Sequence, residues 1–133
     1  MWQFLKPYVV AFGVLLVIEG AWLTLIAKNF YQKELGFLMS DSPKLIPTAM
    51  FALVFIAGLV FFVINPALAK DSWKYALLAG LFFGLVSYST YDLTNLATLK
   101  GWPLIVSAVD LVWGSVMSAS VSTISYFILK IIG

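Results

Sequence analysis

The sequence of 133 residues contains no histidine, no cysteine and no arginine. Without cysteine the chain can form no disulfide and offers no thiol nucleophile, and without histidine it has no imidazole base. The usual ligand sets of zinc, haem and iron–sulfur clusters are missing as well, so no cofactor is expected. Carboxylate, amide and hydroxyl oxygens and lysine amines are the chemistry that is left.

Charge is scarce too. Charged residues make up 11% of the chain and hydrophobic residues 62%, whereas a soluble domain is about half apolar and about a quarter charged. The net charge of +2 is weak and dispersed, so nucleic acid is not an expected partner. The composition predicts an integral membrane protein whose partners are membrane lipids.

Four apolar runs fill most of the length, each near the roughly 20 residues that cross a bilayer core. The expected spans cover about residues 7–27, 43–65, 73–99 and 103–131. They predict an all-α protein of one transmembrane domain, folded as an antiparallel four-helix bundle. The first run is long for a cleaved signal peptide and contains an acid, which favours a retained helix. The lysines divide equally between the two membrane faces, so they do not orient the bundle.

Residues that start, stop or kink helices mark the ends of these runs. Proline suits the first turn of a helix, a small polar residue its N-cap, and glycine the position just past its end. The residues expected to act in these ways are Pro7, Ser42 with Pro43, Asn65 with Pro66, Asp71 or Ser72, Gly101 and Pro103. Residues 28–42 are typical either of a short interfacial helix or of an ordered loop with aromatic anchors.

Polar residues are concentrated in residues 88–103, YSTYDLTNLATLKGWP, at the end of the third span. A carboxylate or amide at bilayer depth costs about a few kcal/mol unless it finds a partner. Such a cluster is therefore typical of a segment that binds, conducts or braces something. This stretch is the first place to look for a functional site.

Three acids fall inside the expected spans: Glu19, Asp92 and Asp110. Each lies seven to nine residues from the lysine or proline that ends its span on the same membrane face. At about 1.5 Å per residue, all three lie roughly 10 to 14 Å from that face. We expect them to project from separate helices into one interior pocket.

Small and polar residues follow one side of each of the last two spans. In the third they lie within an arc of about 120°, and in the fourth within about 80°. These residues are Gly80, Gly84, Tyr88, Tyr91, Asp92, Asn95 and Thr98, and then Ser107, Asp110, Gly114, Ser118 and Ser125. The GxxxG pair favours close packing inside the bundle over packing between chains, and the serines are typical of helix packing.

Tryptophan follows an acid by three residues twice, in EGAW from Glu19 to Trp22 and in DLVW from Asp110 to Trp113. Residues three apart lie on one side of a helix, and an indole N–H can only donate. Each tryptophan is therefore expected to pack against a carboxylate or to donate a hydrogen bond to it.

The run YDLTNLATLKGWP at 91–103, with DLVWG at 110–114 and WL…FYQKELG at 22–36, resembles a bacterial membrane family catalogued as domain of unknown function 2177. The resemblance covers essentially the whole chain. It implies a multi-pass, four-span protein of the bacterial inner membrane whose family has no established activity. Glu19 stands where similar sequences are expected to carry aspartate. The motif positions are Trp22, Tyr31, Tyr91, Asp92, Thr94, Asn95, Thr98, Lys100, Gly101, Trp102, Pro103, Asp110, Trp113 and Gly114.

Three carboxylates in one dry layer cannot all stay ionised, because repulsion and desolvation both disfavour the charged form. Some must hold protons, pair with Lys28 or Lys100, or coordinate a cation. The expected ligand- or ion-binding residues are Glu19, Trp22, Tyr88, Tyr91, Asp92, Thr94, Asn95, Thr98, Lys100, Asp110 and Trp113. No resident metal is expected.

The residues leave several functions open. The favoured one is proton- or cation-linked transport of a small molecule, for which a homodimer is expected because four helices are few for alternating access. The alternative is a lipid-binding or scaffold protein, in which the polar layer grips a headgroup. A lipid-modifying enzyme, with Asp92 or Asp110 as base and Lys100 orienting an anionic group, is less favoured. A purely structural polar network is the last reading.

Overall fold

Residues 1–40 and 44–133 are described in a computed structural model, and those that are regular are helical throughout. The first span is α1 (Trp2–Ala21) with a π-helical turn (Trp22–Ile26), and it leads into α2 (Lys28–Leu35). The second is α3 (Leu45–Leu59), a second π-helical turn (Val60–Ile64) and α4 (Asn65–Lys70), and the last two are α5 (Trp73–Thr98) and α6 (Leu104–Ile132). All four are long and apolar enough to cross a membrane, which confirms the predicted four-helix membrane bundle.

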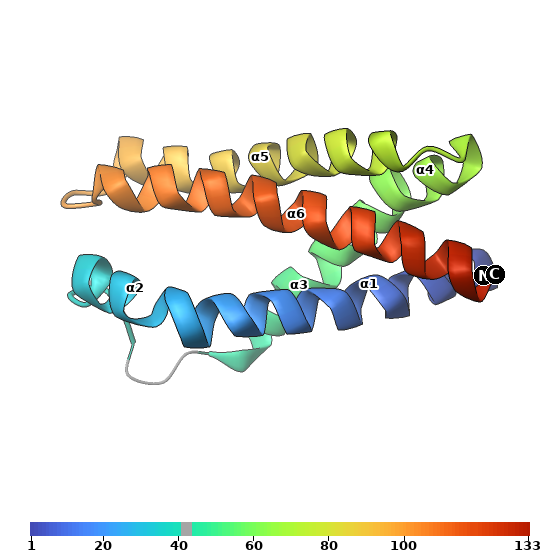
Figure 1. The fold of residues 1–133 in the computed structure, drawn as a ribbon. Coiled ribbons are helices and arrows are strands. Elements are labelled where there is room, and N and C mark those ends of the chain that lie inside the picture. The colour runs from blue at the N-terminus through green and yellow to red at the C-terminus, as the bar shows by residue number, and fades with distance from the viewer. Residues whose placement is uncertain (41–43) are drawn as a thin grey trace.

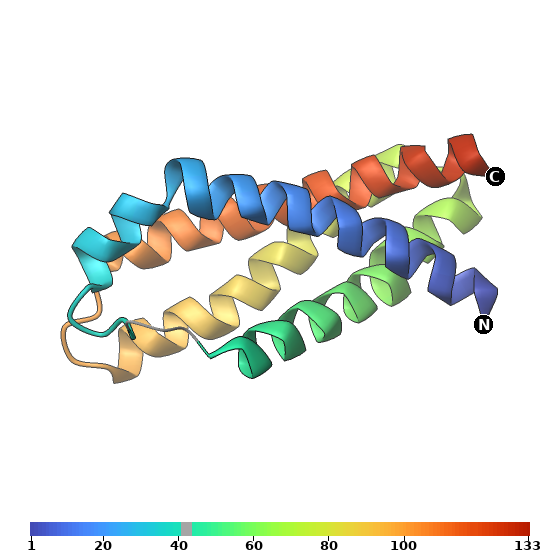
Figure 2. The same cartoon turned by 90° about the horizontal axis from the view of Figure 1, so that it is seen from below.

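The four spans form a bundle in which α5 and α6 lie side by side over their length (Figure 1). Both chain ends lie at the same end of the bundle, as an even number of spans requires. Seen from below, α1 runs diagonally, starting near the second span and then lying against α6 (Figure 2). The Tyr8 hydroxyl, which donates to the Leu53 carbonyl at 2.8 Å, ties the first part of α1 to α3.

Small residues bring α5 and α6 close together. A Cβ on Gly80 would lie 2.7 Å from Oγ of Ser122, and a Cβ on Gly84 would lie 2.5 Å from Cβ of Ser118. Real Cβ atoms essentially never come so close, so neither glycine can be replaced without moving the helices. The GxxxG pair therefore packs inside the bundle, as predicted.

The apolar core lies where the second span crosses the others. Its fully buried side chains include Ile56, Leu59 and Ile64, which pack with Ala11 of α1 and Met117 of α6. Large hydrophobic side chains also cover the outside of every span. This suits a chain surrounded by lipid, because lipid tails are as apolar as leucine.

Pro7 lies in the second turn of α1 and not in its first turn as expected, because the helix begins at Trp2. Proline has no N–H, so the carbonyl of Gln3, four residues earlier, loses its helical donor. The Nδ2 of Asn65 donates to this oxygen at 3.4 Å. A side chain from the second span thus satisfies the group that the proline leaves free, which fixes the start of α1 against α4.

The second span continues through Asn65 and Pro66 to Lys70, beyond the end near Ile64 that the sequence suggested. Pro66 lies in the first turn of α4, directly after a π-helical turn that takes up the irregularity. The carbonyl of Phe62, four residues earlier, accepts from the Tyr75 hydroxyl at 3.4 Å. The expected N-cap Ser42 and its neighbour Pro43 lie outside the described residues.

The remaining turns agree closely with the sequence. Ser72 is the N-cap of α5, since its Oγ accepts from the Tyr75 N–H at 3.1 Å, while Asp71 ends α4 with a φ of 51°. Gly101, with a φ of 76°, lies two residues past the C-cap Leu99, so it shapes the turn and does not cap α5 directly. Between the first two spans a helix, α2, covers residues 28–35, which favours the helical reading over the loop.

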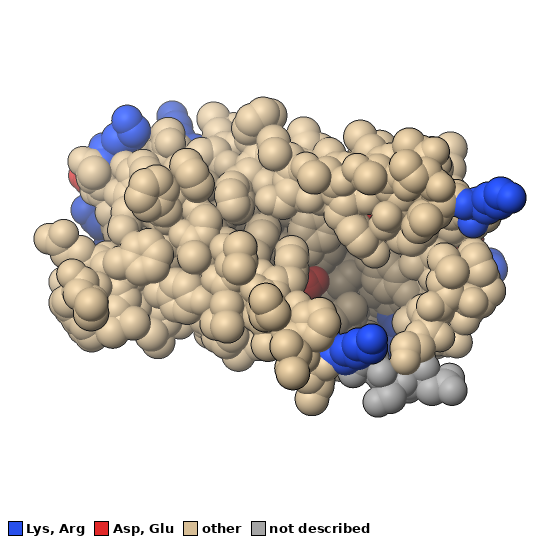
Figure 3. Space-filling model, turned by 180° about the vertical axis from the view of Figure 1, so that it is seen from behind, with Lys and Arg blue, Asp and Glu red and all other residues tan. Residues whose placement is uncertain are grey.

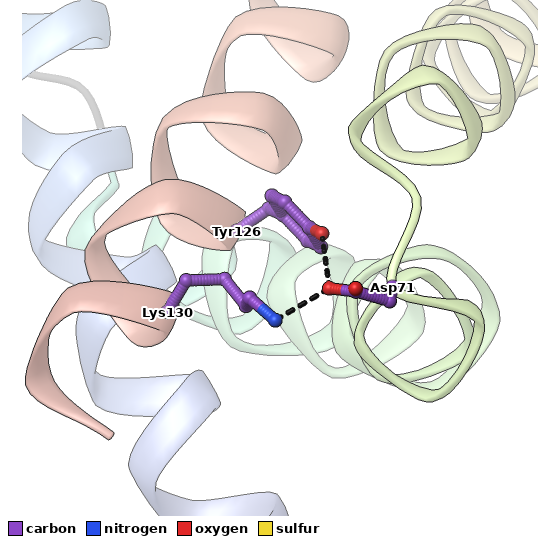
Figure 4. A network of polar contacts seen from close by, with 3 residues as sticks. All are labelled: Asp71, Tyr126 and Lys130. Carbon is purple, nitrogen blue, oxygen red and sulfur yellow. Dashed lines mark hydrogen bonds and ion pairs between the residues drawn. The ribbon is translucent and has the colours of Figure 1, made fainter.

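A polar network that the sequence analysis did not anticipate lies at the end of the bundle that holds the termini. Asp71 accepts from the Tyr126 hydroxyl at 3.2 Å and forms an ion pair with Lys130 (Figure 4). The Lys130 ammonium holds the pKa of Asp71 below its usual value. Because both charged side chains are exposed, the pair contributes little free energy, but it ties the turn after α4 to the last turn of α6.

Candidate functional site

The α5–α6 interface buries two acids beside each other. Asp92 is 0% exposed and Asp110 6% exposed, and their carboxyl groups lie close enough to interact directly. Among the described residues, neither oxygen of Asp92 has a hydrogen-bond donor. Two ionised carboxylates cannot bond each other because both only accept, whereas one proton lets one of them donate to the other.

Asp110 has a partner from a different element. The hydroxyl of Tyr31, on α2, donates to Oδ1 of Asp110. Burial, together with this hydrogen bond, raises the pKa of Tyr31 above its ordinary value, so the phenol keeps the proton that it donates. Tyr31 was not among the expected binding residues. Its place in the FYQKELG segment of the family motif was the signal that could have pointed to it.

Glu19 is bonded by a tryptophan, although not by the one on its own helix. The Nε1 of Trp113, on α6, donates to Oε1 of Glu19 at 2.8 Å. The Trp22 ring stacks on Trp113, with ring centroids 4.2 Å apart and planes 7° from parallel. The hydrogen bond therefore joins the acid of the first acid–tryptophan pair to the tryptophan of the second, and it holds the second half of α1 against α6.

Tyr88 lies among the three acids. Its ring packs directly over Gly114, so that any side chain at position 114 would overlap it. Glu19, Asp110 and Asp92 all lie close enough to act on the Tyr88 hydroxyl electrostatically. All three acids thus act on one tyrosine, but within the described ranges no group of three acids is arranged to hold a metal ion.

A chain of hydrogen bonds fixes the backbone of Asp92. The Nε1 of Trp102 donates to Oγ of Ser107 at 3.0 Å, and this hydroxyl donates to the Asp92 carbonyl at 3.1 Å. The Tyr91 ring meets Trp102 edge-on, with ring centroids 6.0 Å apart. The loop before α6 therefore holds the end of α5 in register with α6.

Three expected site residues do not join the buried acids. Thr94, Thr98 and Lys100 are exposed, and the Thr98 hydroxyl donates to the Thr94 carbonyl of its own helix at 2.7 Å. They lie in the last two turns of α5 or just past it. Lys100 forms no ion pair with any acid in the described part of the chain. Asn95, one turn past the acid pair, is half-buried.

A groove of about 530 Å³ lies between α3 and α5 next to the acids, lined by Pro47, Thr48, Phe51, Ser87, Tyr88 and Tyr91. Tyr88 lines the groove and also lies close enough to the three acids to be affected by them, so its side chain connects the groove with the acids. Seen from behind, the surface of the molecule is hollowed, and an acidic side chain is visible in the hollow (Figure 3).

Buried hydroxyls continue from the acid pair along α6. Ser118, Ser122 and Ser125 are each 0% exposed, and their hydroxyl oxygens have no hydrogen-bond partner among the described residues. Serine in a helix often bonds the carbonyl of the preceding turn, but these three do not. They form a polar line between the acids and the end of the bundle where Tyr126 bonds Asp71.

Four apolar spans with acids buried between them define a multi-pass membrane protein. Residues 4–127 match the model of the family described as "Predicted membrane protein (DUF2177)", and the chain belongs to this family, as its sequence resemblance predicted. No curated protein and no solved structure matches the chain.

Proposed function

We propose that the protein is a proton-linked membrane transport protein in which Asp92 and Asp110 bind the coupling proton. The observation that carries the proposal is the buried Asp92 carboxyl group, which has no donor for either oxygen and a second carboxyl group beside it. Two adjacent negative charges without a cation are too costly in a dry interior, so the pair holds a proton at neutral pH.

The hydrogen bonds around the pair favour one position for this proton. The Tyr31 hydroxyl already donates to Asp110, while nothing donates to Asp92 among the described residues. We therefore assign the proton to Asp92, whose oxygens have no hydrogen-bond partner among the described residues. Loss of the proton leaves two negative charges, one on α5 and one on α6, that repel each other. Binding of a proton therefore removes a repulsion between the two helices.

Transport requires access to the acids from both sides. The groove between α3 and α5 approaches the acids through Tyr88, and the unpaired hydroxyls of Ser118, Ser122 and Ser125 lead toward the opposite end. A second copy of the chain is part of the proposal, because four helices are few for alternating access. Residence in a bacterial inner membrane is part of it too.

A proton is a better fit than a metal cation as the coupling ion. Hard cations need several oxygen ligands in one shell, and no three acids of the described residues are arranged in that way. A proton needs only the carboxyl pair.

Lipid binding is a second candidate function. The observation that favours it is the groove between α3 and α5, whose lining is largely apolar and whose Phe51 and Tyr91 rings are 52% and 56% exposed. Mass spectrometry of the protein released from detergent micelles would detect a retained phospholipid. A phospholipid that stays bound while proton flux is absent would support this candidate in place of transport.

The test of the proposal uses purified protein in two measurements. Infrared difference spectra between neutral and alkaline pH, where exposed carboxyl groups stay ionised, should contain the C=O stretch of a protonated carboxyl group, and Asp92→Asn should remove it. Liposomes that contain the protein and a pH-sensitive dye should equilibrate an imposed pH gradient faster than empty liposomes, and Asp92→Asn should return the rate to the leak of empty liposomes.

Asp71→Asn is the matched control, because Asp71 is an exposed acid outside the buried layer. It should keep both the infrared band and the flux. Wild-type liposomes with verified insertion that stay inert, or an Asp92→Asn variant that conducts like the wild type, would contradict the proposal.

A further inference from the structure

We infer that the groove between α3 and α5 binds a lipophilic organic cation, and that this is the substrate class of the proposed transport. The inference rests on the proposed function for its coupling to protons, whereas binding itself can be measured without transport. The groove has the volume of an ordinary small-molecule site, at about 530 Å³. None of its lining residues is charged, and three of the six are aromatic.

Two of the four hydroxyl groups that line the groove, those of Thr48 and Ser87, can only accept a hydrogen bond from a ligand. Thr48 Oγ1 donates to the Lys44 carbonyl at 2.9 Å, and Ser87 Oγ donates to the Phe83 carbonyl at 2.8 Å. Each hydroxyl carries one hydrogen, so these two oxygens have only lone pairs left to offer a ligand. An anion needs donors, which they cannot provide, whereas a cation is stabilised by acceptors.

The aromatic rings favour the same charge. The faces of aromatic rings attract cations, and Phe51 and Tyr91, which line the groove, are each more than half exposed. Tyr88 extends this preference inward, because the three acids lie close enough to act on it electrostatically. Lys44 precedes α3 by one residue, but it is exposed and is not part of the lining.

The acids supply the long-range attraction. The Trp113 N–H orients the Glu19 carboxyl group, and the carboxyl pair of Asp92 and Asp110 also lies close enough to act on Tyr88 electrostatically. In an interior of low dielectric constant, such charges are felt over a longer distance than in water. A neutral lipid tail would fill the groove equally well, but it would gain nothing from these acids.

The experiment compares two probes of nearly equal size and shape but opposite charge. Tetraphenylphosphonium, a cation, and tetraphenylborate, an anion, are titrated into the full-length protein in detergent micelles in a calorimeter, with empty micelles as the blank. Saturable binding of the cation alone is the expected result. Tyr91→Leu should weaken it about two- to thirtyfold, the range of a lost cation–π contact.

Two further variants show where the cation binds. Phe82→Leu removes another exposed ring of α5, 62% exposed and outside the groove, and should leave the affinity unchanged. Glu19→Gln keeps an acceptor for Trp113 and removes the charge, so it should weaken the cation several-fold while the protein stays folded. Thermal unfolding of each variant verifies the fold.

Equal binding of both probes, binding of neither, or equal effects of Tyr91→Leu and Phe82→Leu would overturn the inference. A phospholipid that tetraphenylphosphonium fails to displace would also overturn it, in favour of a lipid occupant. Binding of the cation without proton flux would refute the proposed transport and leave this site in place. Proton flux without binding of the cation would overturn this inference and leave the proposed transport in place.

Discussion

Replacing Asp92 by valine removes a carboxyl group that no described residue satisfies and leaves the side chain similar in size. Asp92 is 0% exposed, and both of its oxygens lack a partner in the described part of the chain. A buried polar group left without a hydrogen bond costs roughly 1–3 kcal/mol. Its neighbour Asp110 adds repulsion whenever both are ionised.

The valine variant should therefore be more stable than the wild type. Replacement of a buried ion pair by apolar residues of similar volume is often neutral or stabilises by about 1–4 kcal/mol in soluble proteins, and we expect the same direction for a single carboxyl group without a partner. In a membrane protein the unfolded chain also finds partners for its polar groups, so we expect the lower part of this range, about 1–2 kcal/mol. The free energy of unfolding is measured by titrating the protein in mixed micelles with a denaturing detergent.

Asp110→Val is the matched control, and we expect it to change the free energy of unfolding in the opposite direction. It removes the acceptor of the Tyr31 hydroxyl and leaves a half-buried phenol without its partner. We expect this variant to be less stable by about 1–2 kcal/mol. If Asp92→Val loses as much stability as Asp110→Val, then Asp92 is a structural residue and the reasoning that assigns it the proton is refuted.

Two other predictions concern packing and charge. Gly84→Ala should lower the free energy of unfolding by about 1–3 kcal/mol, because its Cβ would overlap the Gly114 carbonyl, whereas Gly13→Ala, which meets no atom within 4 Å, should be neutral or up to about 1 kcal/mol more stable. Because Lys130 lowers the pKa of Asp71 from 3.8, its ion pair stabilises the fold above that pH and ceases to do so as the pH falls through the folded-state pKa. The small difference in melting temperature between the wild type and Asp71→Asn should therefore be present at neutral pH and vanish well below 3.8. A difference that persists in acid would mean that Asp71 acts through something other than its charge.

Much of the fold could be predicted from the sequence, because lipid imposes a simple rule on span length. The third helix, Trp73–Thr98, ends within one residue of the expected 73–99. The close approach of α5 and α6 followed from Gly80 and Gly84.

The rest depends on contacts between segments that are distant in the chain. Pattern and spacing gave no reason to pair Tyr31 with Asp110, because this bond depends on where α2 lies after the first span. The crossed bond from Trp113 to Glu19 likewise depends on how α1 lies against α6. The helical wheel placed Thr98 on the same side of α5 as Gly80, but it could not show that Gly80 is buried while Thr98 is exposed.

Gly114 limits how members of this family can diverge. The Tyr88 ring occupies the space that a side chain at position 114 would need, and the Gly114 carbonyl lies where a Cβ on Gly84 of α5 would be. A relative that acquires even a methyl group at position 114 must shrink residue 88 or spread the two helices, and either change would open the space around the acids to lipid. Substitutions at positions 84, 88 and 114 are therefore expected to occur together among homologues.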